Sequence, residues 1–257
     1  MIGFCPLGSG SKGNCIYFGS PQAKILIDAG MSAKAICLKL AEIGVAIEDI
    51  DAILITHEHS DHITGLKVLA FKYNIPIFAN AETAKGIVDF LQECPKFKIF
   101  STGEPFEFRD LHIHPFSIQH DTLDPVGFIL RLDQLKVGFC ADVGFISTLV
   151  RNHLQHCDYL YVEANHQPSM VHACSRPMVY KQRVLSRTGH LSNEDCGKLL
   201  ADVAHDGLKQ VFLAHLSSEC NTPDVAKNVV EDILAKYSMK LNLSIAHQAK
   251  VSDKVLF

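Results

Sequence analysis

Thr56-His57-Glu58-His59-Ser60-Asp61-His62 is the most informative stretch of this 257-residue sequence. It follows directly after Ala52-Ile53-Leu54-Ile55, an apolar run that predicts a core strand, and it brings four metal-ligating side chains into six residues. Polar groups this dense at the end of a buried strand need an attractive partner, which a metal cation supplies and a chance cluster of solvated histidines does not. The fifth residue counted from His57 is Asp61, which excludes the His-Glu-x-x-His motif of helical zinc sites. We therefore expect a metal site at a strand-to-helix junction.

The composition is that of a globular protein without a membrane segment. The chain is 47% hydrophobic and 20% charged, which is enough apolar material to bury a core. Its formal net charge of -4 gives no long-range basic field, so any site for a polyanion must be local. No run approaches the roughly 18 to 20 apolar residues that span a bilayer, and the first residues lack a signal-peptide pattern, so we expect a cytoplasmic protein. Nine cysteines without a Cys-x-x-Cys pair predict reduced, mostly buried thiols.

Short apolar runs alternate with helical patterns along the chain. No linker or repeat interrupts them, so we expect a single domain over residues 1–257. Residues 99–136 are typical of consecutive strands, while the flanks alternate strand and helix, which predicts an α/β protein with two sheets and outer helices, an αββα sandwich. The predicted strands are 24–28, 52–56, 76–79, 111–118, 126–132, 136–142, 159–163, 210–215 and 241–246, and the predicted helices are 32–43, 63–73, 81–92, 145–155, 193–205 and 223–237.

The pattern Thr-His-x-His-x-Asp-His after an apolar strand resembles the signature loop of the metallo-β-lactamase superfamily, whose fold is an αββα sandwich with a metal pair in its cleft. Four further stretches, one before this loop and three after it, resemble the other motifs of that family and stand in the same order, so the resemblance covers about residues 1–220. These stretches are Lys24-Ile25-Leu26-Ile27-Asp28-Ala29-Gly30, Gln119-His120-Asp121, Phe139-Cys140-Ala141-Asp142-Val143-Gly144 and Val211-Phe212-Leu213-Ala214-His215-Leu216.

This resemblance implies two divalent metal ions and a support for the metal loop from Asp28. Imidazole and carboxylate ligands suit zinc, manganese or iron, so the ligands alone do not choose the metal. Two cations about 3.5 to 4 Å apart lower the pKa of a shared water to near 7, which implies metal-bound hydroxide as the nucleophile. The implied ligands are His57, His59 and His120 for one ion, Asp61, His62 and His215 for the other, and Asp142 as the bridge.

His190 stands in Thr188-Gly189-His190-Leu191-Ser192-Asn193-Glu194, which resembles the Gly-His-Ser stretch of the tRNA-maturing and related phosphodiesterase branches. In those branches the matching histidine meets a glutamate that follows an upstream strand, a position that Glu163 fills here. The resemblance implies that Glu163 orients His190, which donates a proton to the leaving oxygen near Asp61. The alternative is an ordinary loop histidine beside a solvated glutamate. His166, three residues after Glu163, either reaches the cleft as a substrate-binding residue or does not.

Gly8-Ser9-Gly10-Ser11-Lys12-Gly13 matches the dinucleotide fingerprint by its letters, but strand-like residues rather than a helix follow it. We predict instead a Gly-rich turn whose amides, with Lys12 and Asn14, line the cleft and hold a phosphate. Together with Glu-Ala-Asn-His and Gly-His-Leu-Ser further on, this stretch resembles the bacterial YycJ/WalJ branch, which is associated with exonuclease action on DNA.

Residues 167–193 contain no Asp or Glu but contain three arginines, a lysine and Tyr180. This local positive segment favours binding of a phosphodiester backbone, with Arg183 and Arg187 as the predicted contacts and Tyr180 available for stacking. The alternative is a solvated loop with ordinary surface charges. We interpret His112 and His114, two apart on a predicted strand, as a solvent-facing pair rather than a second metal site.

Competing functions differ in the residues they require. The flavodiiron oxidoreductases of the superfamily use a glutamate where this chain has His59, and β-lactam hydrolysis outside the cytoplasm needs an export signal. Thioester hydrolysis shares the ligands but not the Glu163 and His190 stretches, and a non-catalytic binding role is disfavoured because no ligand is missing. The sequence therefore predicts a metal-dependent phosphodiesterase that acts as a nuclease, with DNA favoured over RNA. The alternative is a small-molecule thioester or phosphodiester hydrolase of the same fold.

Overall fold

The computed structural model describes residues 1–257, and the chain forms two compact units. The first unit comprises Met1–Pro115, Thr122–Val126 and Ala246–Phe257, and the second comprises Phe116–Asp121 and Gly127–Ile245. No helix is both long enough and apolar enough to cross a membrane. The assignment of residues 1–257 to a single domain stays a prediction.

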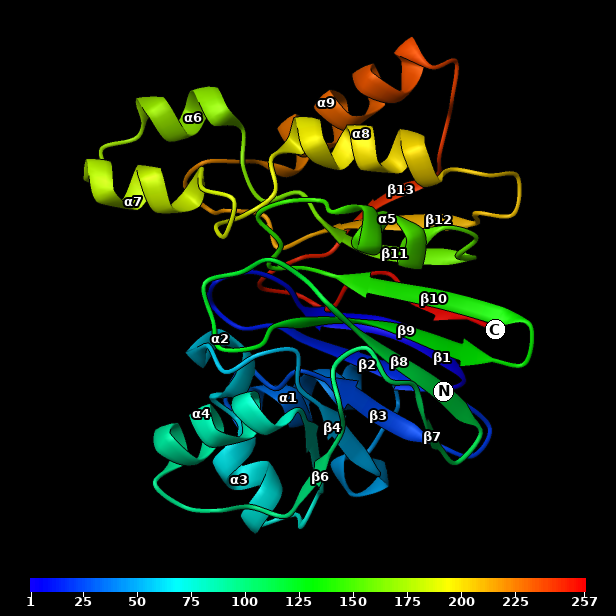
Figure 1. The fold of residues 1–257 in the computed structure, drawn as a ribbon. Helices are drawn as coiled ribbons and strands as arrows, with labels where there is room; N and C mark the ends of the chain where they lie inside the picture. Colours follow the sequence, from blue (N-terminus) through cyan, green and yellow to red (C-terminus); the bar gives the residue numbers. More distant parts are fainter. The chain divides into compact units, whose positions relative to one another are not determined.

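The first unit is built on a mixed sheet with the strand order β14-β1-β2-β3-β4-β5-β6 (Figure 1). Its first part is antiparallel, and the strands from β3 to β6 run parallel. Strands β3 and β4 carry almost only buried apolar residues, as expected of parallel strands covered on both faces. The strands are β1 Gly3–Gly8, β2 Cys15–Gly19, β3 Lys24–Ile27, β4 Ala52–Leu54, β5 Ile77–Ala79, β6 Phe97–Ile99 and β14 Val255–Leu256, and a hairpin follows of β7 Phe106–Phe108 and β8 Leu111–Ser117.

Two helices of the first unit begin at side-chain caps that the sequence supplies. Ser32 accepts a hydrogen bond from the amide of Ala35 at 3.3 Å, and Asn80 accepts one from the amide of Thr83 at 2.8 Å. The apolar faces of these helices pack into one core with the sheet. The elements are α1 Ala33–Glu42, the 3₁₀ turn η1 Ile47–Asp49, α2 Ser60–Ile63, α3 Leu66–Phe71 and α4 Ala81–Leu91.

The second unit contains strands in the order β13-β12-β11-β10-β9, of which β9 and β10 form an antiparallel hairpin and β10 to β13 run parallel. Because parallel strands end at the same edge, the residues after β10, β11 and β12 lie close together. The strands are β9 Val126–Leu132, β10 Leu135–Cys140, β11 Tyr159–Glu163, β12 Gln210–Ala214 and β13 Leu243–Ile245, and the helices are α5 Thr148–Leu154, α6 Pro168–Ala173, α7 Met178–Val184, α8 Asn193–Val203 and α9 Pro223–Lys236.

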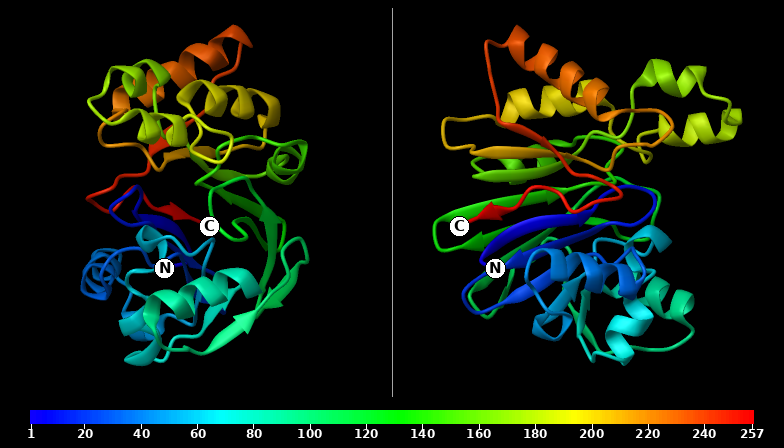
Figure 2. Two further views of the ribbon diagram at one scale, coloured as in Figure 1. Left: turned by 60° about the vertical axis from the view of Figure 1, so that its left-hand side comes forward. Right: turned by 180° about the vertical axis from the view of Figure 1, so that it is seen from behind.

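All nine predicted strands and all six predicted helices are present with ends shifted by a few residues. The predicted N-terminus of α8 is confirmed, since the Ser192 hydroxyl accepts a hydrogen bond from the amide of Asp195 at 3.1 Å. On β8, His112 is exposed as expected, whereas His114 is half-buried and its Nε2 lies 3.1 Å from the carbonyl oxygen of Gly103. Helices α6 and α7 were not predicted from the sequence, because with 6 and 7 residues they are too short to show a helical period. In Figure 1 and in the rear view of Figure 2 this helix pair stands to one side of α8 and α9.

Candidate metal centre

The metal loop of the first unit rests on Asp28, which follows β3 and is buried. The Asp28 carboxylate accepts a hydrogen bond from the amide of Thr56 at 2.9 Å and one from Nδ1 of His62 at 2.8 Å. Because an ionised carboxylate only accepts, Nδ1 of His62 carries the hydrogen and Nε2 is left as the donor atom for a ligand. A carboxylate behind an imidazole is the usual second partner of a metal-binding histidine.

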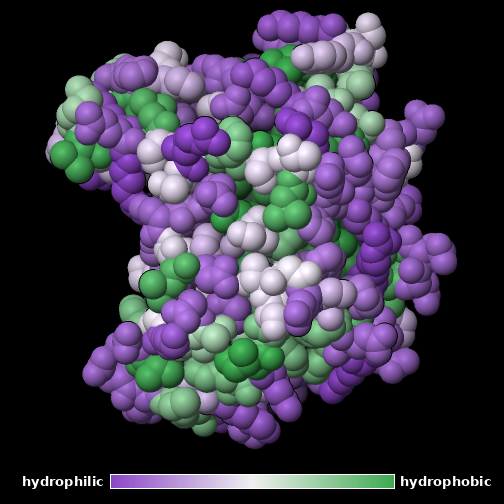
Figure 3. Space-filling view, in the orientation of Figure 1, coloured by the Kyte–Doolittle hydropathy of each residue, from purple (hydrophilic) through white to green (hydrophobic).

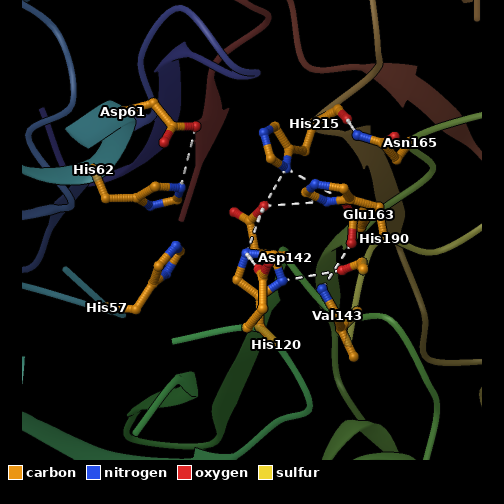
Figure 4. A network of polar contacts seen from close by, with 12 residues as sticks. His57, Asp61, His62, His120, Asp142, Val143, Glu163, Asn165, His190 and His215 are labelled. Atoms are coloured by element: carbon orange, nitrogen blue, oxygen red, sulfur yellow. Dashed lines mark hydrogen bonds and ion pairs between the residues drawn. The ribbon is translucent and has the colours of Figure 1, made fainter. Parts of the chain in front are cut away.

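Three imidazoles of this loop lie together at the end of β4. The ring centroids of His57 and His62 are 4.0 Å apart, and those of His57 and His59 are 4.9 Å apart. The Asp61 carboxylate lies 3.7 Å from Nε2 of His62 (Figure 4). The amide nitrogen of Asn14 lies 2.9 Å from Nε2 of His62 and 3.3 Å from the Asp61 carboxylate. Asn14, a predicted substrate-binding residue, thus contacts the metal loop itself.

Glu58, which lies between two predicted ligands, links the metal loop to a distant segment, a role that was not predicted from the sequence. Its carboxylate accepts a hydrogen bond from the amide of Leu123 at 2.9 Å. A Cβ atom at Gly86 would lie 2.5 Å from Cγ of Glu58, so α4 leaves room for this side chain only because residue 86 is glycine. Glu58 therefore ties the segment Thr122–Val126 to the metal loop, a link between residues 65 positions apart that no local pattern announces.

The second unit gathers four more titratable groups at the ends of its parallel strands. Asp142, Glu163, His190 and His215 each place a ligand atom within 4.8 Å of the others, a group able to hold a metal ion. Nδ1 of His215 lies 2.7 Å from the Asp142 carboxylate, and Nδ1 of His190 lies 2.8 Å from the Glu163 carboxylate (Figure 4). The structure thus brings Glu163 to His190 as the sequence analysis expected.

Glu163 is fully buried and serves two loops at once. One carboxylate oxygen accepts hydrogen bonds from the amides of Val143, at 2.7 Å, and Leu191, at 3.3 Å, while the other accepts from His190. Burial acts to raise the pKa of Glu163, but the charge of His190 and hydrogen bonds from His190 and His215 outweigh it and lower the pKa to about 2. The carboxylate is therefore ionised at neutral pH and holds Nδ1 of His190 as a hydrogen-bond donor.

His120 is buried in the second unit with a defined ring orientation. Its Nδ1 donates to the carbonyl oxygen of Gly189 at 3.0 Å, and its Nε2 lies 3.8 Å from the Asp142 carboxylate. Donation from Nδ1 leaves Nε2 as the ring atom able to bind a ligand, the same arrangement as at His62. The next residue, Asp121, is held by Arg183 of α7 through two hydrogen bonds of 2.5 and 3.1 Å. Arg183, a predicted substrate contact, is thus bound to an acid in this structure.

The other predicted substrate-binding residues have different surroundings. Lys12 is exposed, and its amide donates to the side chain of Gln248 at 3.3 Å. His166 is only 2% exposed, and its Nδ1 has no hydrogen-bond partner in the protein. Burial lowers the pKa of His166, which favours a neutral ring. Arg187 is exposed and lies over the ring of Phe145.

Two mixed sheets flanked by helices, with His and Asp side chains where strands end, define a metallo-β-lactamase fold. The family profile described as "Beta-lactamase superfamily domain" matches residues 23–216, and the chain belongs to the metallo-β-lactamase superfamily. The predicted family and fold class are therefore confirmed.

Similar proteins narrow the group further. The chain is similar to exodeoxyribonuclease YycJ of Bacillus anthracis, with 36% identity over 234 residues that cover 90% of this chain and 88% of the relative. It is similar to exodeoxyribonuclease WalJ of Streptococcus pneumoniae, with 37% identity over 255 residues that cover 96% and 92%. Among solved structures, the metallo-β-lactamase fold protein YhfI from Bacillus subtilis matches with a TM-score of 0.74 at 17% identity, covering 96% of this chain and 97% of that one. At that identity the structural match shows the fold alone.

Proposed function

We propose that this protein is a metal-dependent phosphodiesterase that removes nucleotides from DNA, in the cytoplasm as the sequence predicts. The observation that carries the proposal is the cluster of Asp142, Glu163, His190 and His215, in which His190 is half-buried and the other three are buried. It combines metal-ligating residues with a histidine held as a proton donor by a buried carboxylate. Support comes from two exodeoxyribonuclease relatives that are 36% and 37% identical over most of the chain.

The residues present fit two divalent metal ions. His62 and His120 each donate Nδ1 to an oxygen acceptor and keep Nε2 as a ligand atom, and Asp142 is a buried carboxylate of the kind that cations require. All candidate ligands are imidazole or carboxylate, which suits zinc, manganese or iron. We propose that His57, His59 and His120 hold one ion, that Asp61, His62 and His215 hold the other, and that Asp142 is shared.

Bound in this way, the two ions supply Lewis acidity toward the phosphate and a water that is ionised near neutral pH. The chain itself supplies the proton for the leaving oxygen. Nδ1 of His190 donates to Glu163, so the proton that is transferred is carried by Nε2 of the same ring. Asn14 fixes the Asp61 carboxylate from the side, and Lys12 and Arg187 hold the charged backbone of the substrate. His166 and Arg183 complete the proposed substrate contacts.

End-labelled single- and double-stranded DNA and RNA, incubated with the protein in manganese or zinc, test the proposal. We expect stepwise loss of label from DNA by wild type, and a rate about 10² to 10⁴ lower for His190→Ala, as for loss of a general acid. His112→Ala, which removes an exposed histidine of β8, is the matched control and should cleave like wild type. The same cleavage rate for His190→Ala and wild type, at equal metal content, would contradict the assigned proton donor.

One observation favours the alternative of a small-molecule thioester or phosphodiester hydrolase. Arg176 and Arg183, two of the cations expected to attract a polymer, are each bound to a carboxylate, of Glu219 and Asp121. Protein that binds two metals per chain, cleaves no nucleic acid and hydrolyses a small thioester or phosphodiester would replace the nuclease proposal with this one.

A further inference from the structure

The acid-free segment 167–193 carries four cationic side chains, and the structure gives them different partners. Arg176 forms an ion pair with Glu219, and Arg183 forms one with Asp121. Lys181 donates to the carbonyl oxygen of His172 at 2.7 Å. Arg187 has no carboxylate partner, and its guanidinium carbon lies 3.9 Å from the centroid of the Phe145 ring. Arg187 is therefore the arginine of this segment whose charge is not already neutralised.

In Figure 3 the surface over α6 and α7, at the upper left, is hydrophilic around a small apolar group.

The backbone places this pair beside the buried acids of the second unit. Phe145 is three residues after Asp142, and Arg187 is three residues before His190. A Cβ atom at Gly144 would lie 2.6 Å from the carbonyl oxygen of Arg187, so the two loops touch backbone to backbone at a glycine. Phe145 is 39% exposed, whereas Asp142 is 2% exposed. The stack therefore lies at the solvent-facing border of the group that contains Asp142 and His190.

A guanidinium that stacks on an aromatic ring keeps its N–H edge available for an anion. The attraction to the ring face fixes the long side chain in one arrangement, so less entropy is lost when the edge binds a phosphate. Arg187 forms no ion pair with Asp142 or Glu163, although its loop leads directly to them. Its charge thus serves a position outside the buried group and not the reacting phosphate.

We propose that Arg187, held against Phe145, binds a backbone phosphate next to the one that is cleaved, and that Phe145 is its positioning residue. The proposal rests on the proposed nuclease function and deepens it, because it distinguishes polymeric from small phosphodiester substrates. It also separates Arg187 from Arg183, which the sequence analysis treated alike.

The test compares kcat/KM for a single-stranded oligonucleotide and for bis(p-nitrophenyl) phosphate, with the metal-loaded protein at several salt concentrations. Arg187→Gln should lower kcat/KM for the oligonucleotide about tenfold more than for the small ester. Its plot of log(kcat/KM) against log salt should lose about 0.7 of slope, the contribution of one single-strand phosphate contact. Arg176→Gln removes an equal charge that Glu219 already neutralises and is the matched control, with the slope expected to match wild type.

Phe145 is tested by the same measurements. Phe145→Leu should raise KM for the oligonucleotide in the direction of Arg187→Gln with little change in kcat, and Phe145→Tyr should restore the wild-type KM because it keeps the ring. Metal content and thermal unfolding midpoint identify any variant that is misfolded.

These measurements distinguish failure of the phosphate contact, of the positioning role of Phe145 and of the nuclease function. An Arg187→Gln slope equal to that of wild type, or equal losses on both substrates, would overturn the phosphate contact while leaving the nuclease function intact. A Phe145→Leu variant with wild-type KM would overturn the positioning role. If wild type cleaves the small ester but no polymer, the proposed function fails and this inference fails with it.

Discussion

Replacing Glu163 by glutamine tests whether its carboxylate holds His190 as the proton donor. The carboxylate accepts hydrogen bonds on both oxygens, from His190 on one side and from the amides of Val143 and Leu191 on the other. An amide of the same shape has one oxygen, so its NH₂ group must face a donor on one of these two sides. A buried donor left without an acceptor costs about 1 to 3 kcal/mol. For a chain of this size each kcal/mol lowers the unfolding midpoint by about 2 to 4 °C, so Glu163→Gln should unfold about 2 to 12 °C below wild type.

The same substitution should also lower kcat strongly, beyond what a loss of a few degrees in the unfolding midpoint would cause. Without the carboxylate, Nδ1 of His190 loses its ionised acceptor, and general acid catalysis contributes about 10² to 10⁴ in rate. Both substitutions disable the same proton transfer. The double variant Glu163→Gln/His190→Ala should therefore have the same kcat as His190→Ala alone. Glu107→Gln, at an exposed site in β7, is the control for the carboxylate-to-amide change. A Glu163→Gln protein that keeps the midpoint within 1 °C and kcat within about twofold of wild type would refute this reasoning.

Three further expectations concern metal, packing and charge. Removing metal with a chelator should abolish cleavage and lower the unfolding midpoint, since ions bound only by the folded state stabilise it, and adding manganese or zinc back should restore both; an unchanged midpoint would argue against a structural contribution. Gly30→Ala should give insoluble or metal-poor protein, because the added methyl would lie 1.6 Å from the carbonyl oxygen of Asp61. Gly44→Ala is the control, since its methyl would meet no other atom and only the positive φ opposes it. This variant should lose about 1 to 2 kcal/mol of the free energy of unfolding, measured by urea titration. The hydrogen bond from Arg176 lowers the pKa of Glu219, so its stabilisation is present above the ordinary carboxyl pKa and is lost as pH falls through the lowered value; the midpoint difference between wild type and Glu219→Gln should therefore shrink from pH 7 to pH 3.

The residues that follow the core strands could be predicted because their signal is local. An apolar run that ends in several ligand side chains marks both a strand and a site, as at His57 and at His215. The interactions of the same residues over long distances in the chain could not be predicted. The partner of Arg183 is 62 residues away, and the partner of Arg176 is 43 residues away. The composition of residues 167–193 shows that this segment is basic, but the ion pairs that neutralise two of its charges involve acids outside the segment.

Backbone strain gives an independent indication of where function is located in the chain. Nine residues other than glycine have a positive φ, and several of them occupy turns or helix ends, such as Gln92 after α4. Asp28, Asp142 and His215 are different, because each follows a core strand and has φ values of 61°, 55° and 52°. A left-handed residue costs about 1 to 2 kcal/mol when it carries a Cβ atom, and glycine would avoid the cost.

Polar contacts offset that cost at the same positions. Thr56 donates to the Asp28 carboxylate, Asn165 donates to the carbonyl oxygen of His215, and Nδ1 of His215 lies 2.7 Å from the Asp142 carboxylate. Strained residues of this kind persist only where the surrounding structure holds them. Glycine would adopt these positive φ angles at lower cost. The presence of Asp28, Asp142 and His215 instead of glycine therefore indicates that their side chains are needed. Backbone angles and polar contacts within each unit thus point to Asp28, Asp142 and His215, three of the residues that the family motifs assign to the metal centre.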